Sequence, residues 1–325
     1  FNTAVGFFAG NDVTTATNNT LIGALAGDAL TTGASNVAVG YLALSTDDVG
    51  QHNVAIGRQA LENQNIATAA NTYNVAVGSS AGQSLTTGTL NTFMGGLAAD
   101  AITDGTRNVA VGYAALTTDT RGQRSTAIGY GALADQNLTT ASASHNTAVG
   151  YNAGGAITTA IRTTILGALA SDAATTGERN VALGYAALSA DTKGNRSVSI
   201  GYEALGTQNF TTSTDNYNVG IGYLAGNVIS TGVQNTLVGG LSGDVLTDAD
   251  DNVAMGYASL SSDTLGSKST ALGRSALANQ NFTTATETYN VAVGYHAGIS
   301  VTTGTFNTFV GSETGDGMTT ATGNT

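Results

Sequence analysis

Two columns of aspartates offer the clearest acid–base chemistry in this chain. Both columns repeat every 72 residues, and they comprise Asp28, Asp100, Asp172 and Asp244 in one and Asp47, Asp119, Asp191 and Asp263 in the other. Paired carboxylates could cleave glycosidic bonds. A catalytic pair is expected once in a chain, however, and these aspartates are copied four times. We therefore interpret them as solvated turn residues and expect no catalytic residues and no enzyme.

A serine motif suggests hydrolysis, but the repeat explains it better. Gly78-Ser79-Ser80-Ala81-Gly82 matches the Gly-x-Ser-x-Gly elbow of serine hydrolases. The equivalent segments carry Phe8, Asn152 or His296 at the place of the nucleophile. We interpret the match as an accident of repetition.

Metal and cofactor chemistry has little support. The chain has no Cys, and its three histidines (His52, His145 and His296) lie in different contexts of the repeat. A phosphate-binding loop is missing, and so is the Gly-Gly-x-Gly-x-Asp signature of calcium-binding β-rolls. We expect no cofactor and no metal site.

The elements that must position any functional residue follow a strict repeat. Glycines end five-residue phrases such as Asn36-Val37-Ala38-Val39-Gly40, with steps of 17, 17, 17 and 21 residues that then start again. The eighteen glycines are 6, 23, 40, 57, 78, 95, 112, 129, 150, 167, 184, 201, 222, 239, 256, 273, 294 and 311. Four short units therefore form a 72-residue super-repeat, the signature of a solenoid.

Each phrase predicts a short β-strand. The residue three before the glycine is Val or Thr, and the residue just before it is Val, Ile, Leu or Met. These positions share one face of a strand, and we expect them to fill the interior. An Ala three residues after the glycine, a second short strand and a polar turn should complete one coil.

The fold predicted is all-β: a parallel β-solenoid of about 18 coils, formed by residues 1–325 as one continuous segment. The chain starts and stops within the repeat, so we expect a piece of a longer fibre. The Asn that opens most phrases should form a ladder along the axis. N-glycosylation is the alternative for Asn137, Asn209 and Asn281, which lie in Asn-x-Thr sequons.

Composition limits the partners. A net charge of −12 argues against nucleic acid, which needs a basic stripe. Apolar runs are too short for a membrane helix, so we expect no membrane insertion. Gly does not recur at every third position and Pro is absent, which excludes collagen.

A ladder of large apolar residues predicts self-association. The residue two before the glycine is usually Ala and is expected to face outward. It becomes large once in each super-repeat, at Leu21, Phe93, Ile165, Leu237 and Phe309. An exposed apolar ladder usually marks a contact surface, so we expect an inter-chain seam. The alternative is that these side chains fill a wider rung inside one chain.

The fourth coil of each super-repeat carries four extra residues, which predict a row of loops. Insertions in solenoids often lie on the binding side. Their Gln-Asn pairs and following aromatic rings suit a sugar or a neighbouring chain. The expected contact residues are Gln64, Asn65, Tyr73, Gln136, Asn137, His145, Gln208, Asn209, Tyr217, Gln280, Asn281 and Tyr289.

The phrases Asn-Val-Ala-Val-Gly and Ser197-Val198-Ser199-Ile200-Gly201 resemble the head repeats of trimeric autotransporter adhesins. Similar phrases occur in repetitive phage tail-fibre proteins. The resemblance implies a left-handed parallel β-roll, three chains side by side, and a role in surface attachment. The 17/17/17/21 rhythm is longer than the usual head repeat.

These observations favour a structural fibre shaft with an adhesive role, extracellular, on a virion or a cell surface. Its expected partners are copies of itself, as a homotrimer or higher filament, and a surface glycan or protein receptor. A bacterial trimeric adhesin head is the main alternative. An ice-binding solenoid and a glycan-degrading tailspike are less favoured.

Overall fold

The computed structural model describes residues 1–325 and contains strands and turns but no helix. No segment forms a helix that could cross a membrane. The chain divides into two compact units, Phe1–Arg162 and Thr163–Thr325. Each unit is a parallel β-solenoid with one three-residue strand per coil, and the two units together have about 18 coils. The predicted fold class is confirmed, whereas the single continuous segment stays a prediction.

In the first unit the strands pair in register, so equivalent residues of successive coils stack. Val37, for example, pairs with Thr20 on one side and Val54 on the other. The strands are β1 (Thr3–Val5), β2 (Thr20–Ile22), β3 (Val37–Val39), β5 (Val54–Ile56), β7 (Val75–Val77), β8 (Thr92–Met94), β9 (Val109–Val111), β11 (Thr126–Ile128) and β13 (Thr147–Val149).

The second unit repeats the same stack. Val198 pairs with Val181 and with Val219. The strands are β14 (Thr164–Leu166), β15 (Val181–Leu183), β17 (Val198–Ile200), β19 (Val219–Ile221), β20 (Thr236–Val238), β21 (Val253–Met255), β23 (Thr270–Leu272), β25 (Val291–Val293) and β26 (Thr308–Val310).

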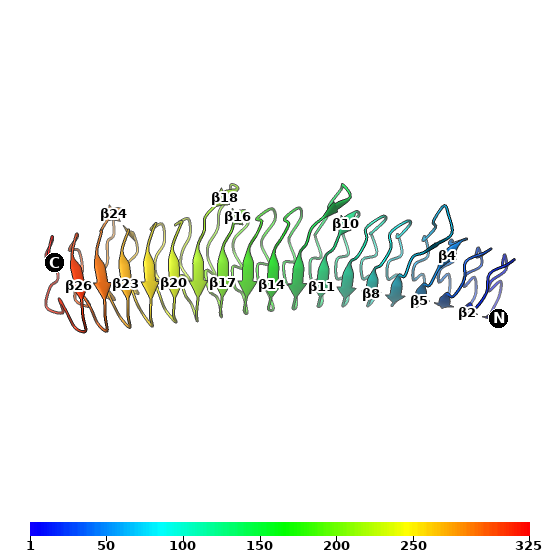
Figure 1. Ribbon diagram of the computed structural model, residues 1–325, viewed down its shortest axis with the longest axis horizontal. Coiled ribbons are helices and arrows are strands. Elements are labelled where there is room, and N and C mark those ends of the chain that lie inside the picture. The colour runs from blue at the N-terminus through cyan, green and yellow to red at the C-terminus, as the bar shows by residue number, and fades with distance from the viewer. The chain divides into compact units, whose positions relative to one another are not determined.

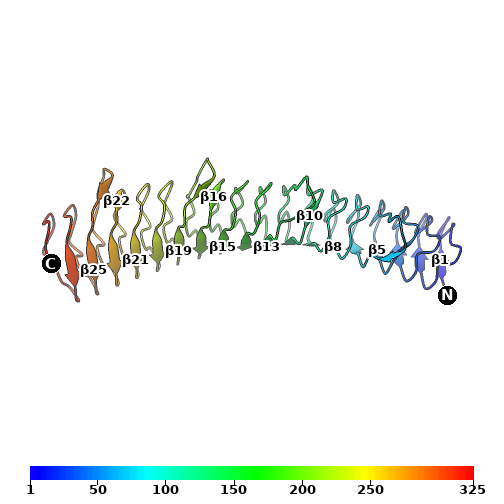
Figure 2. The same ribbon diagram turned by 45° about the horizontal axis from the view of Figure 1, so that its top comes forward.

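A second strand forms only beside the four-residue insertions. These two-residue strands pair in parallel, as in β10–β12, and Figures 1 and 2 show β10 and β16 on loops that rise above neighbouring coils. The pairs are β4 (Gly50–Gln51) with β6 (Ala70–Asn71), β10 (Gly122–Gln123) with β12 (Ser142–Ala143), β16 (Gly194–Asn195) with β18 (Thr214–Asp215), and β22 (Gly266–Ser267) with β24 (Thr286–Glu287). The prediction of a second strand in every coil is therefore wrong.

The segment after each strand glycine is a run of tight turns, which explains the missing second strand. Gly40 has φ +136°, and a Cβ added there would lie 2.5 Å from the carbonyl oxygen of Gly57 in the next coil. Leu42 and Leu44 then adopt φ +56° and +51°. Residues in the left-handed region turn the backbone away from the extended path of a strand.

The interior is lined by the face of the strand opposite to the one predicted. Ala38 and Ala55 are fully buried, while Val37 and Val39 are half-buried and Ile56 is exposed. Because both strand faces are apolar, alternation alone cannot identify the inner one. The small side chains line the interior because the strand and the returning turns pack closely together. The prediction that the Val and Ile positions fill the core is wrong.

The seam prediction is wrong for the same reason. Its five residues are 0–5% exposed within the chain, so their side chains cannot form an outward ladder: Leu21, Phe93, Ile165, Leu237 and Phe309. They fill wider rungs of the interior, as the alternative proposed. Glycines make the room, since a Cβ at Gly82 would lie 2.7 Å from the Phe93 ring.

The asparagine column is buried and bridges successive coils. The Asn36 backbone N–H donates to Asn19 Oδ1 at 2.8 Å, and Asn36 Nδ2 donates to the Gly50 carbonyl at 2.9 Å. The same pattern links Asn53 to Asn36. Each side-chain amide therefore satisfies backbone groups of its neighbours, and the predicted ladder runs mainly through amide-to-backbone bonds.

Candidate interaction surfaces

The outer face of the strands is an exposed apolar strip in each unit. Residues before the strand glycine that are 37–68% exposed are Val5, Ile22, Ile56, Met94 and Ile128 in the first unit, and Leu166, Met255 and Val310 in the second. They stack with the half-buried apolar residues at the same position of the intervening coils, such as Val111 beside Ile128 and Leu272 beside Met255, because the strands pair in register. Contiguous exposed apolar surface of this kind typically marks an interaction site.

A tyrosine ladder borders this strip, and sequence reasoning missed it. Tyr113, Tyr130 and Tyr151 stack with ring centroids 5.5 Å apart. Tyr185, Tyr202 and Tyr223 do the same at 5.4 and 5.5 Å in the second unit. The signal was present, since nine of the twelve tyrosines directly follow a strand glycine.

Two cations occupy places in the tyrosine column, Arg58 and Arg274. The Arg274 guanidinium carbon lies 5.9 Å from the Tyr257 ring centroid and 5.8 Å from that of Tyr295. This geometry is that of a cation–π contact on both faces. The column thus accepts a planar cation in place of a ring.

The glutamines of the decorated loops are buried, which corrects their predicted role in ligand contact. Gln64, Gln136, Gln208 and Gln280 are 0% exposed. Gln136 Nε2 donates to Asp119 Oδ2 at 2.6 Å and to Ser125 Oγ at 2.8 Å. Gln136 Oε1 accepts from Asn146 Nδ2 at 2.8 Å. Their amides therefore fasten the loop to the interior.

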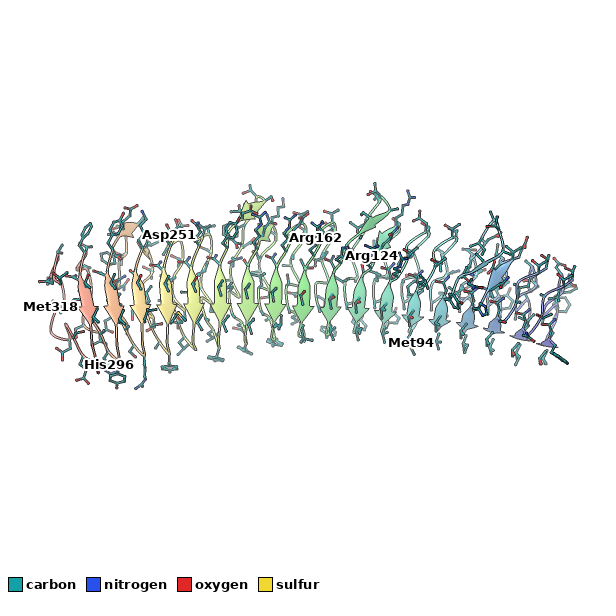
Figure 3. The ribbon with its side chains drawn as sticks, viewed as in Figure 1. Met94, Arg124, Arg162, Asp251, His296 and Met318 are labelled. Carbon is teal, nitrogen blue, oxygen red and sulfur yellow. The ribbon has the colours of Figure 1, made fainter.

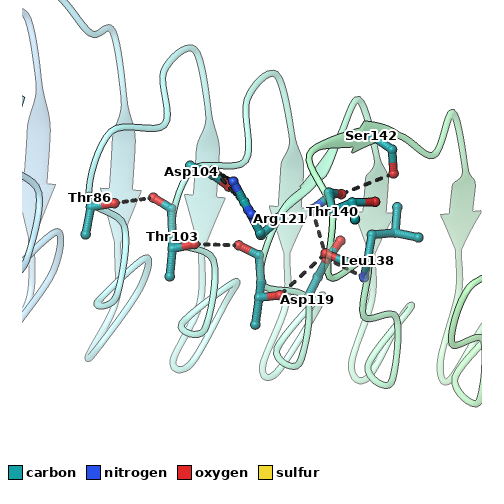
Figure 4. Close-up of polar contacts among 10 residues, drawn as sticks. Thr86, Thr103, Asp104, Asp119, Arg121, Leu138, Thr140 and Ser142 are labelled. Carbon is teal, nitrogen blue, oxygen red and sulfur yellow. Dashed lines mark hydrogen bonds and ion pairs between the residues drawn. The ribbon is translucent and has the colours of Figure 1, made fainter.

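One aspartate column completes this buried network. Asp119 Oδ1 accepts from the backbone N–H groups of Gly122 and Leu138 at 3.0 and 3.1 Å. Figure 4 shows Asp119 and Leu138 in this cluster. The prediction of solvated turn residues is wrong for this column, since Asp47, Asp119, Asp191 and Asp263 are 0–2% exposed. The other column is half-buried: Asp28, Asp100, Asp172 and Asp244.

Burial also raises the pKa of three aspartates in each column. It raises the pKa of Asp47, Asp119 and Asp191 above the ordinary value of 3.8, although hydrogen bonds to each carboxylate oppose the shift. In the other column, burial likewise raises the pKa of Asp28, Asp172 and Asp244.

The other predicted loop residues remain at the surface. Tyr73, Tyr217 and Tyr289 are 43–49% exposed, and His145, Asn65, Asn209 and Asn281 are also exposed. Asn137 is half-buried and accepts a 3.1 Å hydrogen bond from Thr120 Oγ1. Their role in ligand contact stays a prediction. The apolar residue of each loop packs inward, as Leu138 and Phe210 show at 7% and 6% exposure.

The side chains that could do chemistry are dispersed, buried or stacked on neighbours. No three His, Cys, Asp or Glu side chains gather where they could hold a metal ion. Ser80, in the serine motif, is only 6% exposed. His52 stacks on Tyr73, and His296 stacks on Tyr295.

No family model matches the chain, and no curated protein matches it. The interpretation of these surfaces therefore depends on their own geometry.

Proposed function

We propose that this chain is a structural shaft segment of an extracellular fibre, assembled as a homotrimer, with a role in surface attachment. One observation carries the proposal: each unit presents a stacked apolar strip on the outer face of its strands. The strip replaces the buried ladder as the proposed contact between chains.

Physical chemistry supports self-association through this strip. Burying apolar surface is worth about 25 cal/mol per Å², and the strip is repeated in every coil. Its in-register stacking means that a second copy meets the same pattern along the whole unit. The number three comes from the resemblance to adhesin heads.

The chemistry of the chain supports a mechanical role. The strands pair with neighbouring coils throughout each unit, and the buried asparagine column adds hydrogen bonds along the stack. Such ladders resist local opening because each coil is held on both sides. A virion fibre and a bacterial surface adhesin are the two settings that we propose.

Substitutions on the strip test the proposal. Met94→Asp with Ile128→Asp should place unpaired carboxylates in the contact and reduce the mass in light scattering from three chains to one. The control is Thr87→Asp with Thr159→Asp, which adds the same charge at exposed polar positions. An unchanged mass for the strip variant, with its circular dichroism intact, would reject the seam. Immunogold labelling of the natural source would show whether the fibre belongs to a virus particle or a cell envelope.

A further inference from the structure

The corner that precedes each strand carries a column of exposed side chains with one shared backbone conformation. In the first unit, this column holds Arg107, Arg124, His145 and Arg162, one in each of four successive coils. Their φ angles lie between +54° and +61°. The N–H of Arg124 donates to the Thr106 carbonyl at 3.0 Å, and that of Arg162 donates to the Ser144 carbonyl at 2.7 Å. Equal backbone conformations direct the side chains alike. Figure 3 shows Arg124 and Arg162 along one edge of the unit.

These four residues are here called the basic stripe, and its three arginines form no ion pair with an acidic side chain. The ion pairs of the chain involve Arg121, Arg179, Arg196 and Lys268. None involves Arg107, Arg124 or Arg162. Successive coils in a parallel stack are about 4.8 Å apart, which is shorter than the screening length of about 8 Å at physiological salt. Arg107 and Arg124 lie in successive coils, so the repulsion between them is felt, and a bound anion would relieve it.

Residues at the position equivalent to Arg124 in the next two super-repeats do have acidic partners. Arg196 lies 72 residues after Arg124 and pairs with Asp215 at 2.5 Å; Lys268 follows after 72 more and pairs with Glu287. In the parallel register Asp215 lies opposite Asn195, and Glu287 lies opposite Ser267. The residue in that place beside Arg124 is Ala143, opposite Gln123.

Arg107 also lacks the acidic partner that its equivalent in the second unit has. Arg179 lies 72 residues after Arg107 and pairs with the neighbouring Glu178 at 3.2 Å. The equivalent neighbour of Arg107 is Thr106. Both counter-charges present in the second unit are thus replaced by uncharged residues, while the cations are kept.

The charged residues around this column also differ between the two units, with fewer acidic residues in the first. Residues 104–162 contain four arginines and three aspartates, within a chain of net charge −12. Asp104 pairs with Arg121 and Asp119 is buried, which leaves three arginines and the exposed Asp135. In the second unit, Lys268 instead borders a groove lined by Asp248, Asp250, Asp251 and Glu287. The basic stripe is therefore a local reversal of the sign of the surface.

We propose that the basic stripe binds a linear acidic polysaccharide, with carboxylate or sulfate groups meeting the guanidinium groups. Guanidinium binds such planar or clustered oxygens through paired hydrogen bonds. A straight row of single cations matches an extended polymer. Half-buried Thr106 and Gln123 next to the row offer polar groups to sugar hydroxyls. Nucleic acid fits less well, because the strongly acidic remainder of the chain repels it and the row has no stacking platform of several aromatic rings.

This inference rests on the proposed attachment role and names its ligand class. The probes are heparin and polygalacturonate, with neutral dextran and single-stranded DNA for comparison. The intact chain should bind one or both acidic polysaccharides, and binding should weaken as salt rises. Heparin alone would assign sulfate as the anion, and polygalacturonate alone would assign carboxylate.

The decisive variant restores the missing counter-charges. Thr106→Glu with Ala143→Asp should weaken binding roughly tenfold or more, because two new ion pairs compete with the ligand. Neither residue has a positive φ, so the fold should tolerate both changes better than arginine replacements in the column.

Three outcomes would overturn the proposal: no binding by the intact chain, equal binding by the Thr106→Glu/Ala143→Asp variant, or tighter binding of single-stranded DNA than of either polysaccharide. Light scattering on the same samples separates this result from the shaft proposal. An intact chain that forms a trimer but binds neither polysaccharide would reject only the stripe, and an intact chain that is a monomer but binds a polysaccharide would reject only the seam.

Discussion

At the scale of single residues, the most consequential feature is a carboxylate buried without a cation. Asp119 receives three N–H donors, from Gly122, Gln136 and Leu138. These hydrogen bonds satisfy its charge, yet burial still raises its pKa. The same cluster recurs around Asp191, so the repeat copies a polar cluster as well as an apolar core.

Replacing this carboxylate by an amide tests the donor arrangement. Asp119→Asn keeps the shape but sets an NH₂ group against Gln136 Nε2, and turning the glutamine amide over would set its NH₂ against Asn146. We expect the free energy of unfolding to fall by about 1–3 kcal/mol, the cost of an unmatched buried polar group. Urea unfolding at neutral pH measures it. Asp135→Asn, at an exposed position, is the control and should change little.

The same residue predicts a pH dependence. Because the folded-state pKa of Asp119 is raised, the folded chain binds this proton more readily than the unfolded chain. The stabilisation is complete below the ordinary pKa of 3.8 and is lost as pH rises through the folded-state value. Asp119→Asn should flatten the part of the stability profile that begins at pH 3.8 and extends to the raised folded-state pKa. An identical profile for both proteins would contradict the burial assigned to Asp119.

At the scale of the coil, the interior keeps its volume by exchanging side-chain size between two positions. Where the central strand residue is Ala, as at Ala38, the turn contributes a buried Leu such as Leu44. Where the strand contributes Phe93, the equivalent turn residue of its own coil is the small Ala99. The turn residue of the preceding coil is Gly82, where a Cβ would lie 2.7 Å from the ring. Close packing demands this complementarity, since voids and overlaps both destabilise a core.

Truncating the ring tests which face of the strand is internal. Phe93→Ala should lower the free energy of unfolding by about 3–5 kcal/mol, because the small neighbours cannot fill the cavity. Tyr113→Ala is the matched control, since Tyr113 is 52% exposed and stacks on one ring. We expect it to cost no more than about 1.5 kcal/mol. Equal losses in urea unfolding would contradict the assignment of Phe93 to the interior.

The sequence predicts the coil well, but it does not predict which face of each strand points into the interior. The spacing of the glycines identifies the solenoid, the strand positions and the longer fourth coil, because backbone stacking allows only Gly at positions such as Gly40. Apolar residues occupy both faces of each strand, so no periodicity separates Val39 from Ala38. The buried Gln136–Asp119 contact was also out of reach, because it joins residues 17 apart through a register that only the stacked coils define.

At the scale of the whole chain, the super-repeat acts as a unit of construction whose core is copied while its surface charges vary. Arg124, Arg196 and Lys268 keep a cation at equivalent corners, yet only the latter two have acidic partners. In a solenoid, neighbouring coils supply nearly all contacts. Surface charges can therefore diverge between blocks without any change in the packing beneath them.

Removing one complete block tests this modular construction. Deleting residues 58–129 joins Gly57 to Tyr130 and allows β5 to pair with β13 as β11 does now. We expect a folded protein whose urea m-values, summed over all transitions, fall by about one fifth, because m scales with the surface exposed on unfolding. Deleting only residues 58–65 is the control: it shortens one coil out of register and should destabilise the first unit. If both deletions left equally stable proteins, the stack would not depend on register, and if neither folded, the 72-residue block would not be an independent unit of the solenoid.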